Sequence, residues 1–420
     1  MLYGAGSLQT TIDEAQAREI LRRGVEPTCI AGKRVLVLTP DATRTSPMPM
    51  MFRLIVEELG HVAKSLDFMV ALGTHQPMTE EEMLHLFGIT AQERASTYAK
   101  VGLHNHRWDL PDTLVTVGRL EASEIATLTN GLFHEGVDVV INRAALEHDL
   151  IVILGPVFPH EVAGFSGGHK YLFPGISGGQ LLHYTHWLGA VVTCWETIGI
   201  QDTPVRRAIE RAAALVPTPR RLLAMVVRPD AALAGLWAGE VEPAWNAATE
   251  LSCQLHIRRV PKPFHAVLGT ASTMYDELWV AGKVMYKLEP VVADGGRLII
   301  HGKHITHVSR TWGQDIERIG YHVRDYFLGR MDQFQDIPLG VLAHSTHVRG
   351  VGTFEHGVER PRIDVILATS IPEDVCRRIN LGYMDPDTIH LEDYTGKEDQ
   401  GILRVDKAGE ILYRLEADKR

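Results

Sequence analysis

The sequence of 420 residues lacks the features of several protein classes. Its most apolar stretches, such as Leu150–Gly155, are far shorter than the ~20 residues of a membrane-spanning helix. Basic residues are in the minority, with 42 Lys and Arg against 52 Asp and Glu, and the formal charge of −10 argues against binding to nucleic acid or to a membrane. The four cysteines form no Cys-x-x-Cys pair, which argues against a zinc ribbon or a disulfide framework. They are Cys29, Cys194, Cys253 and Cys376.

Signals for export and for two common nucleotide-binding loops are also missing. Residues Met1–Ser7 show no positively charged stretch followed by an apolar core, so we expect a cytoplasmic protein. There is no Gly-x-Gly-x-x-Gly, and there is no Walker motif, because Lys170 follows His169 and precedes Tyr171. Histidine, by contrast, is abundant at 21 residues, which suggests proton transfer or metal ligation.

The chain is longer than one hydrophobic core usually organises, so we expect two domains with cofactor and substrate in the cleft between them. Buried strands alternate with helices in both halves, which predicts an α/β fold with a mostly parallel, helix-flanked sheet in each domain. The prolines of Arg258–Pro263 indicate a boundary. We expect an N-terminal cofactor-binding domain of residues 1–260 plus 394–420, and a smaller C-terminal domain of residues 264–390.

Local patterns lead to more specific predictions. Thr11–Glu14 is typical of a capping box that opens a helix. Ala231–Leu251 is predicted to be helical, and Gly340–Ala343 is predicted to be a strand. Gly401–Leu415 alternates as an edge hairpin does, and we expect it to pack on one of the two domains.

Three polar loops each follow a predicted strand: Asp41–Pro47, Gly73–Pro77 and Gly155–His160. Loops at the carboxyl ends of strands in such a sheet converge on one crevice, so we expect these loops to form one site, although ordinary turns are the alternative for each. Arg44, with the Thr43 and Ser46 hydroxyls, stands just before a predicted helix and is a candidate cradle for a phosphate or a carboxylate.

The richest segment spans residues 159–178 and contains five glycines around Lys170. Glycines let the backbone approach a ligand closely, and a lysine among them is a candidate for covalent attachment or anion binding. A flexible loop with a solvated lysine is the other interpretation.

Histidine pairs give weaker signals. His183 and His186 share one face of a helix and resemble half a metal site, but such pairs more often serve packing. Either His104 or His106 is a candidate general base near neutral pH, and an exposed loop is the alternative. His301–His304 is interpreted as a loop, and Lys283 is either a ligand near a strand end or a surface lysine.

In combination, these motifs resemble the lactate racemase family, the 2-hydroxyacid racemases and epimerases that depend on a nickel-pincer nucleotide, and the similarity runs along essentially the whole chain. The matching motifs are Asp41-x-Thr-Arg44, Gly73-Thr-His75, Asn105-His106, His160 ten residues before Lys170, His186 sixteen residues after it, and Ala281-Gly-Lys283.

The resemblance implies a cofactor, a pyridinium-3-thioamide-5-thiocarboxylic acid mononucleotide that carries nickel and is joined covalently to Lys170. It implies that His186 is the nickel ligand, since the cofactor itself supplies the other donors. The remaining residues that it assigns to cofactor binding are Asp41, Thr43, Arg44, Ser46, His75, Gly167 and Gly168. Separate enzymes that make the cofactor are implied as partners.

The resemblance also implies a hidden redox reaction. Hydride moves from a 2-hydroxyacid to the cofactor and returns to the other face of the planar 2-oxoacid, while a base handles the hydroxyl proton. His106 and His160 match the two acid/base residues, and Lys283 matches the residue that binds the substrate carboxylate. Arg44 and Trp279 are further candidates for contact with the substrate.

Three positions depart from the family pattern. Trp279 and Val280 stand where lactate-specific members carry tyrosine and glutamine, so a bulkier or aromatic 2-hydroxyacid is an expected substrate beside lactate. Arg107 replaces an expected acidic residue and is a candidate to bind a second carboxylate, as in malate.

Two other functions stay open. One is a zinc-dependent or cofactor-free enzyme of the same fold that acts on a small organic acid, and the other is a non-catalytic protein that binds a nucleotide or an anion. The sequence gives no indication of the oligomeric state.

Overall fold

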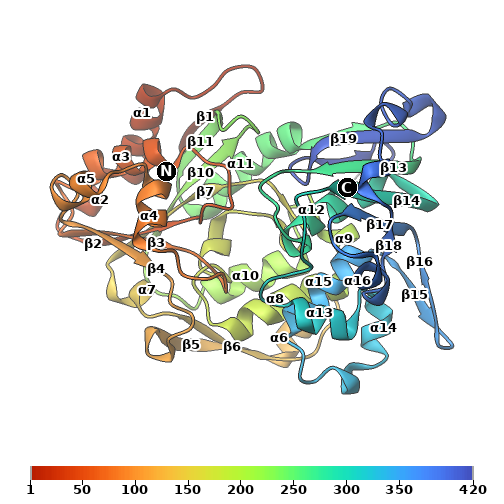
Figure 1. Cartoon of the computed structure of the whole chain (residues 1–420). Coiled ribbons are helices and arrows are strands. Elements are labelled where there is room, and N and C mark those ends of the chain that lie inside the picture. The colour runs from red at the N-terminus through yellow and green to blue at the C-terminus, as the bar shows by residue number, and fades with distance from the viewer. Residues whose placement is uncertain (1, 419–420) are drawn as a thin grey trace. The chain divides into compact units, whose positions relative to one another are not determined.

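The computed structural model describes residues 2–418, and the chain forms two compact units. The first unit comprises Met1–Phe158, Phe165–Leu182 and Arg206–Leu255. The second unit comprises Pro159–Gly164, His183–Val205 and His256–Arg420. Each unit has its own sheet, as the sequence predicts (Figure 1). No helix among the described residues is long and apolar enough to cross a membrane.

The first unit is organised by a seven-stranded sheet in the order β1-β11-β10-β7-β2-β3-β4. Strands β10, β7, β2, β3 and β4 are parallel, and β11 and β1 extend the β10 edge in antiparallel pairing. The strands are β1 (Tyr3–Gly6), β2 (Arg34–Thr39), β3 (Ser65–Val70), β4 (Val101–Asn105), β7 (Leu150–Pro156), β10 (Arg220–Val227) and β11 (Leu233–Gly239). A separate antiparallel pair is formed by β5 (Leu114–Leu120) and β6 (Val137–Asn142).

Helices cover this sheet. They are α1 (Glu14–Val25), α2 (Pro27–Ile30), α3 (Met48–Leu59), α4 (Glu80–Phe87), α5 (Ala91–Ala95), α6 (Ala122–Leu128), α7 (Ala144–Glu147), α10 (Pro204–Ala213) and α11 (Val241–His256). Alternate side chains of β2, such as Val35 and Val37, lie in one apolar cluster with Phe52 of α3 and Leu21 of α1. Strand β2 is buried on both faces, which is typical of a central parallel strand.

The second unit has a five-stranded sheet in the order β18-β17-β14-β13-β19, and all of its pairs are parallel. The strands are β13 (Phe264–Ala271), β14 (Val292–Gly302), β17 (Asp364–Thr369), β18 (Gly382–Tyr383) and β19 (Ile402–Ala408). Two further pairs are β12 (Ile257–Val260) with β20 (Leu412–Leu415), and β15 (Gly352–Glu355) with β16 (Val358–Pro361). The helices are α9 (Cys194–Thr197), α12 (Leu278–Leu288), α13 (Gly313–Ile319), α14 (Arg324–Leu328), α15 (Leu339–Arg349) and α16 (Glu373–Arg378).

Several elements carry the chain across the unit boundary. Helix α8 (Gly179–Val192) begins in the first unit and continues into the second. The short strands β8 (Pro159–His160) and β9 (Gly164–Phe165) pair with each other at another crossing.

The C-terminal segment departs from the expected domain division. Residues 394–420 were expected in the N-terminal domain, but β19 pairs with β13 in the second sheet and β20 pairs with β12. Because β19 and β20 each pair with another strand and lie in separate sheets, Gly401–Leu415 is not a hairpin. Residues 159–164 and 183–205 also belong to the second unit instead of the first. Alternating burial predicts a strand, but it does not specify the strand's partner.

Three local predictions are also wrong. Gly340–Ala343 lies inside α15, because a short apolar run does not distinguish a buried helix from a strand. Ala231–Leu251 contains strand β11 before α11 begins at Val241. The first capping box is formed by Asp13 and Gln16, two residues after the predicted Thr11–Glu14.

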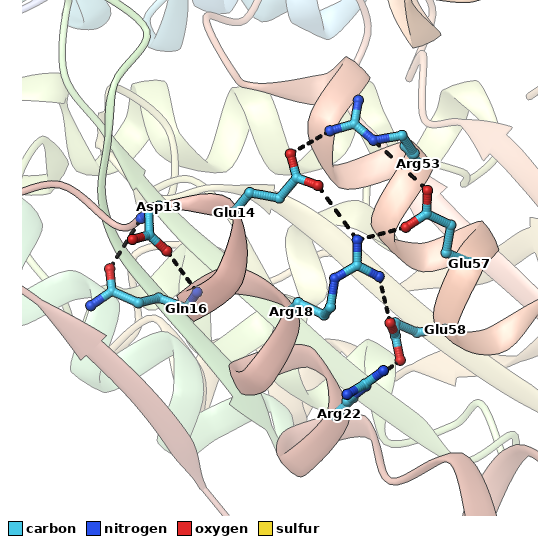
Figure 2. Close-up of polar contacts among 8 residues, drawn as sticks. All are labelled: Asp13, Glu14, Gln16, Arg18, Arg22, Arg53, Glu57 and Glu58. Carbon is cyan, nitrogen blue, oxygen red and sulfur yellow. Dashed lines mark hydrogen bonds and ion pairs between the residues drawn. The ribbon is translucent and has the colours of Figure 1, made fainter.

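Charged side chains join α1 to α3 over the first sheet. Arg18 donates to Glu58 Oε1 at 2.6 Å and to Glu57 Oε2 at 2.6 Å, while Arg22 donates to the second oxygen of Glu58 (Figure 2). Glu14 adds pairs with Arg18 and Arg53. Glu58 is only 5% exposed. Burial opposes its ionisation, but the hydrogen bonds from Arg22 and Arg18 outweigh burial and lower its pKa.

Replacing Glu58 is expected to destabilise the first unit. In Glu58→Gln, two arginines lose a buried charged acceptor, and we expect the free energy of unfolding to fall by roughly 1–3 kcal/mol in urea denaturation at pH 7. The matched control is Glu57→Gln, since Glu57 is half exposed and solvent screens its pair with Arg18, so a much smaller loss is expected. Because the pKa of Glu58 is lowered, the difference between wild type and Glu58→Gln should shrink below about pH 4.5. Equal losses in both variants would contradict this account.

Candidate functional site

The loops that follow β2 and β3 meet at the carboxyl ends of those neighbouring strands. His75 Nδ1 donates to Asp41 Oδ2 at 2.7 Å, and Thr43 donates to Asp41 Oδ1 through both its backbone N–H and its hydroxyl. Because β2 and β3 are adjacent and parallel, their following loops emerge at the same sheet edge. The predicted convergence of these two loops is therefore present.

Asp41 is a buried anion at this edge. Burial would raise its pKa, but the hydrogen bond from His75 and the charges of His75 and Arg44 outweigh burial and hold the pKa well below its ordinary value. Asp41 is thus a carboxylate that orients His75 and Thr43. It is not a proton donor at neutral pH.

The loop after β7 reaches the same place. The guanidinium of Arg44 lies over the ring of Phe158, 5.4 Å from the ring centroid. Arg44 and the half-buried Ser46 stand shortly before α3, whose first residue is Met48. The exposed N–H groups at the start of a helix favour an anion, and the anion cradle of Thr43, Arg44 and Ser46 stays a prediction.

Lys170 lies in a short 3₁₀ helix, Gly168–Tyr171, that packs against β7. The next residue, Tyr171, is close enough to Arg44 and Asp41 for their charges to act on its phenol, whose pKa is raised chiefly by burial. A side chain at Gly155, near the end of β7, would overlap the Tyr171 hydroxyl. The structure therefore brings the lysine segment next to the Asp41–Arg44 loop within the first unit.

His106 follows β4 and is fully buried. Its Nε2–H donates to the Ser177 carbonyl at 2.9 Å, and its Nδ1 accepts from the Asn142 side-chain N–H at 3.1 Å. Asn142 is oriented by its own Oδ1, which accepts from the Ala144 N–H. Burial lowers the pKa of His106 to about 4, so the ring is neutral at pH 7. Both ring nitrogens have protein partners in this structure.

The other predicted residues belong to the second unit. His160 is 4% exposed, and its Nδ1 accepts from the Val162 N–H at 3.1 Å. His186 lies on α8. Lys283 lies on α12 with its ammonium 5.0 Å from the ring centroid of Tyr275. These residues lie in the second unit, whereas Asp41, Arg44 and Lys170 lie in the first unit.

Trp279 has a partner that the sequence did not indicate. Its indole stacks on His344 with ring centroids 4.0 Å apart, and His344 Nε2–H donates to the Trp279 carbonyl at 2.9 Å. This bond leaves the lone pair on Nδ1, which is buried without a hydrogen-bond partner among the described residues. Burial lowers the pKa of His344 to about 3. The false strand prediction at residues 340–343 concealed that His344 lies on a helix facing α12.

The structure also locates the remaining candidates. Arg107 donates two hydrogen bonds to Asp109, at 2.8 and 2.6 Å, so its charge is already balanced. His104 is exposed and lies 3.6 Å from Asp67. His183 is half-buried, and a side chain at Gly340 would overlap its Nδ1. Burial lowers the pKa of His301, which lies in β14 and not in a loop.

Comparisons with known proteins agree with this geometry. The family model "Lactate racemase N-terminal domain" matches residues 5–197, a range that contains Asp41, His106, Lys170 and His186. Two curated lactate racemases are each 26% identical to the chain, over 272 residues for the protein of Thermoanaerobacterium thermosaccharolyticum and over 182 residues for that of Lactiplantibacillus plantarum.

The chain is similar to the lactate racemase family, and residues 5–197 match its N-terminal domain. The two alignments cover 64% and 43% of this chain, but only 59% and 38% of the respective relatives.

Solved structures extend the similarity to almost the whole fold. A Thermotoga maritima protein has a TM-score of 0.84 at 34% identity, covering 96% of this chain and 98% of its own. The lactate racemase apoprotein from T. thermosaccharolyticum has a TM-score of 0.75 at 20% identity, covering 96% and 94%. The chain thus shares its α/β fold with the lactate racemase apoprotein.

His106 is expected to titrate far below an ordinary histidine. Its pKa is about 4 in the folded protein, against 6.5 for a free side chain, so protonation favours the unfolded state. The native state should therefore lose stability as the pH falls from about 6.5 towards 4. Histidine NMR over pH 4–8 would check this, with His106→Gln identifying the resonance. A midpoint above pH 6 for that resonance would show that the ring is not held as described.

Proposed function

We propose that this protein is a member of the lactate racemase family that interconverts the enantiomers of a 2-hydroxyacid and uses a nickel-pincer nucleotide joined to Lys170. The observation that carries the proposal is the assembly of the first unit. There the lysine segment packs against the strand end where Asp41, Thr43, Arg44 and His75 form a cradle for an anion.

The residues present fit such a group. Arg44, Thr43 and Ser46 would hold its phosphate, since a guanidinium and hydroxyls before a helix suit that anion. Gly167 and Gly168 have φ of +79° and +60°, and side chains there would press on Val157 and Trp245, so the turn just before Lys170 requires glycine at both positions.

The metal ligands that the protein offers also suit a nickel-pincer nucleotide. Among residues 2–418, no three His, Cys, Asp or Glu side chains gather in a metal-binding arrangement. Nickel held by His186 would therefore need donors from outside the protein, and a cofactor with its own sulfur and carbon donors supplies them. The same observation does not favour the zinc-dependent enzyme, which needs at least three protein ligands.

When bound, the group would supply a hydride acceptor, and the protein would handle protons and position the substrate. His106 is neutral at pH 7, which is the form that accepts a hydroxyl proton. His160 is the second base that we propose. In both rings Nδ1 accepts an N–H, so the lone pair becomes available only when the substrate replaces that donor or the ring reorients.

Lys283 would bind the substrate carboxylate, and Trp279 would shape the space beside it, since the two residues lie one helical turn apart on α12. The indole is fixed by His344 on one side and is a flat apolar wall. A flat apolar wall supports an aromatic 2-hydroxyacid as the substrate in preference to lactate. The bidentate pair of Arg107 with Asp109 does not support a second substrate carboxylate.

Covalent attachment is the first test. In protein produced together with the cofactor-making enzymes, intact mass spectrometry should show an increase of mononucleotide size, and metal analysis should show nearly one nickel per chain. Lys170→Ala should lose both, because it lacks the amine that forms the thioamide. Wild-type protein that gains neither mass nor nickel under these conditions would refute the proposal.

Substrate preference is the second test. We expect racemisation of phenyllactate to exceed that of lactate and malate, and Trp279→Tyr to shift the phenyllactate-to-lactate ratio of kcat/KM by about tenfold towards lactate. The ratio within one sample corrects for incomplete cofactor loading. A wild-type preference for lactate would disprove the role of Trp279 in admitting a larger substrate.

A further inference from the structure

We infer that Arg206 is a positioning residue that holds the backbone of residues 165–168 in the one conformation that presents Lys170 for cofactor attachment. The inference rests on the proposed role of Lys170. Arg206 itself lies on α10, far from Lys170 in the sequence, and none of the motifs of the family resemblance includes it.

Arg206 donates hydrogen bonds to the backbone just before Lys170. One guanidinium nitrogen donates to the Phe165 carbonyl, and another donates to the Gly167 carbonyl at 3.3 Å. The side chain is 4% exposed. The planar fork of an arginine can hold two carbonyls at once, whereas a lysine ammonium is a point charge without this fixed geometry.

Trp245 of α11 adds a third hydrogen bond to this backbone segment. Its indole N–H donates to the Ser166 carbonyl at 2.8 Å, so side chains hold the carbonyls of residues 165, 166 and 167. The Arg206 guanidinium lies 4.3 Å from the centroid of the same indole. The Ser166 hydroxyl donates to the Pro156 carbonyl at the end of β7, which ties the segment to the sheet.

The same network reaches the residue next to Lys170. His169 Nδ1 and Glu210 Oε2 share a short hydrogen bond, and Glu210 Oε1 lies 3.6 Å from Arg206 Nη1. Glu210 stands one helical turn after Arg206 on α10. Arg206 and Glu210 thus brace the segment on both sides of Gly168.

The glycines explain why such a brace is needed. Gly167 and Gly168 both adopt positive φ, which glycine tolerates but does not prefer strongly over other conformations. Without external contacts this segment would sample many backbone states, and Lys170 would move with it. A buried cation is an expensive way to stabilise a core, since burial lowers the pKa of Arg206 to about 10, yet the group stays charged at pH 7. Holding the backbone before Lys170 in one conformation is a function that accounts for burying the charge of Arg206.

The test compares Arg206→Lys with Arg211→Lys. Arg211 lies on the same helix but pairs with Glu124 at the surface, so it controls for the substitution itself. In cofactor-free protein, hydrogen exchange of the Ser166–Tyr171 amides should be faster in Arg206→Lys than in wild type, while exchange in β2 and β3 is unchanged. When the variant is made with the cofactor-making enzymes, the fraction of chains carrying the adduct on Lys170 should fall by about tenfold.

The two readouts separate the inference from the proposed function. Unchanged exchange in Arg206→Lys would overturn the inference, and so would faster exchange with a normal adduct fraction, because Arg206 would then be merely structural. If wild-type protein forms no adduct, the proposed function fails and the inference, which depends on it, fails with it. Should Arg206→Lys not fold, Trp245→Phe removes the N–H that donates to Ser166 and leaves a smaller aromatic ring beside Arg206, and the same two measurements decide with smaller expected changes.

Discussion

The parallel pairing of β7, β2 and β3 is the constraint on which the candidate site depends. Because these strands run side by side in one direction, the loops that follow them leave the sheet at one edge, and side chains distant in sequence meet there. Asp41 meets His75, and Arg44 meets Phe158, at this edge. The sheet thus supplies the precision that the loops alone would lack.

Around this edge, the protein uses buried charge for orientation. Asp41 stays ionised because His75 and Arg44 compensate its burial, and Arg206 stays ionised although its partners are mostly carbonyls and an indole face. Each unit also contains buried neutral histidines. His106, His344 and His347 are so well buried that their pKa values lie well below the physiological range. Because protonation of these rings favours the unfolded state, their burial costs stability in acid.

The sequence predicted the α/β class, most strands and helices and the convergence of the first two loops, because these follow from local apolar periodicity and from the known geometry of parallel sheets. The same logic failed where one pattern fits two structures. Gly340–Ala343 became helix, and Ile402–Ala408 paired within the second sheet instead of forming a hairpin. A short apolar segment is compatible with several partners, and only the packing of the whole unit selects one.

The sequence by itself determined which residues are candidates for the proposed chemistry, from Asp41 to Lys283, because motif order and spacing can be compared with a family without knowledge of any contact. Tertiary structure alone decided how those residues are held. It placed His344 under Trp279, Asn142 against His106, and Arg206 on the carbonyls before Lys170. Such contacts join residues of different elements, and their geometry depends on how helices and strands pack, which no local pattern encodes.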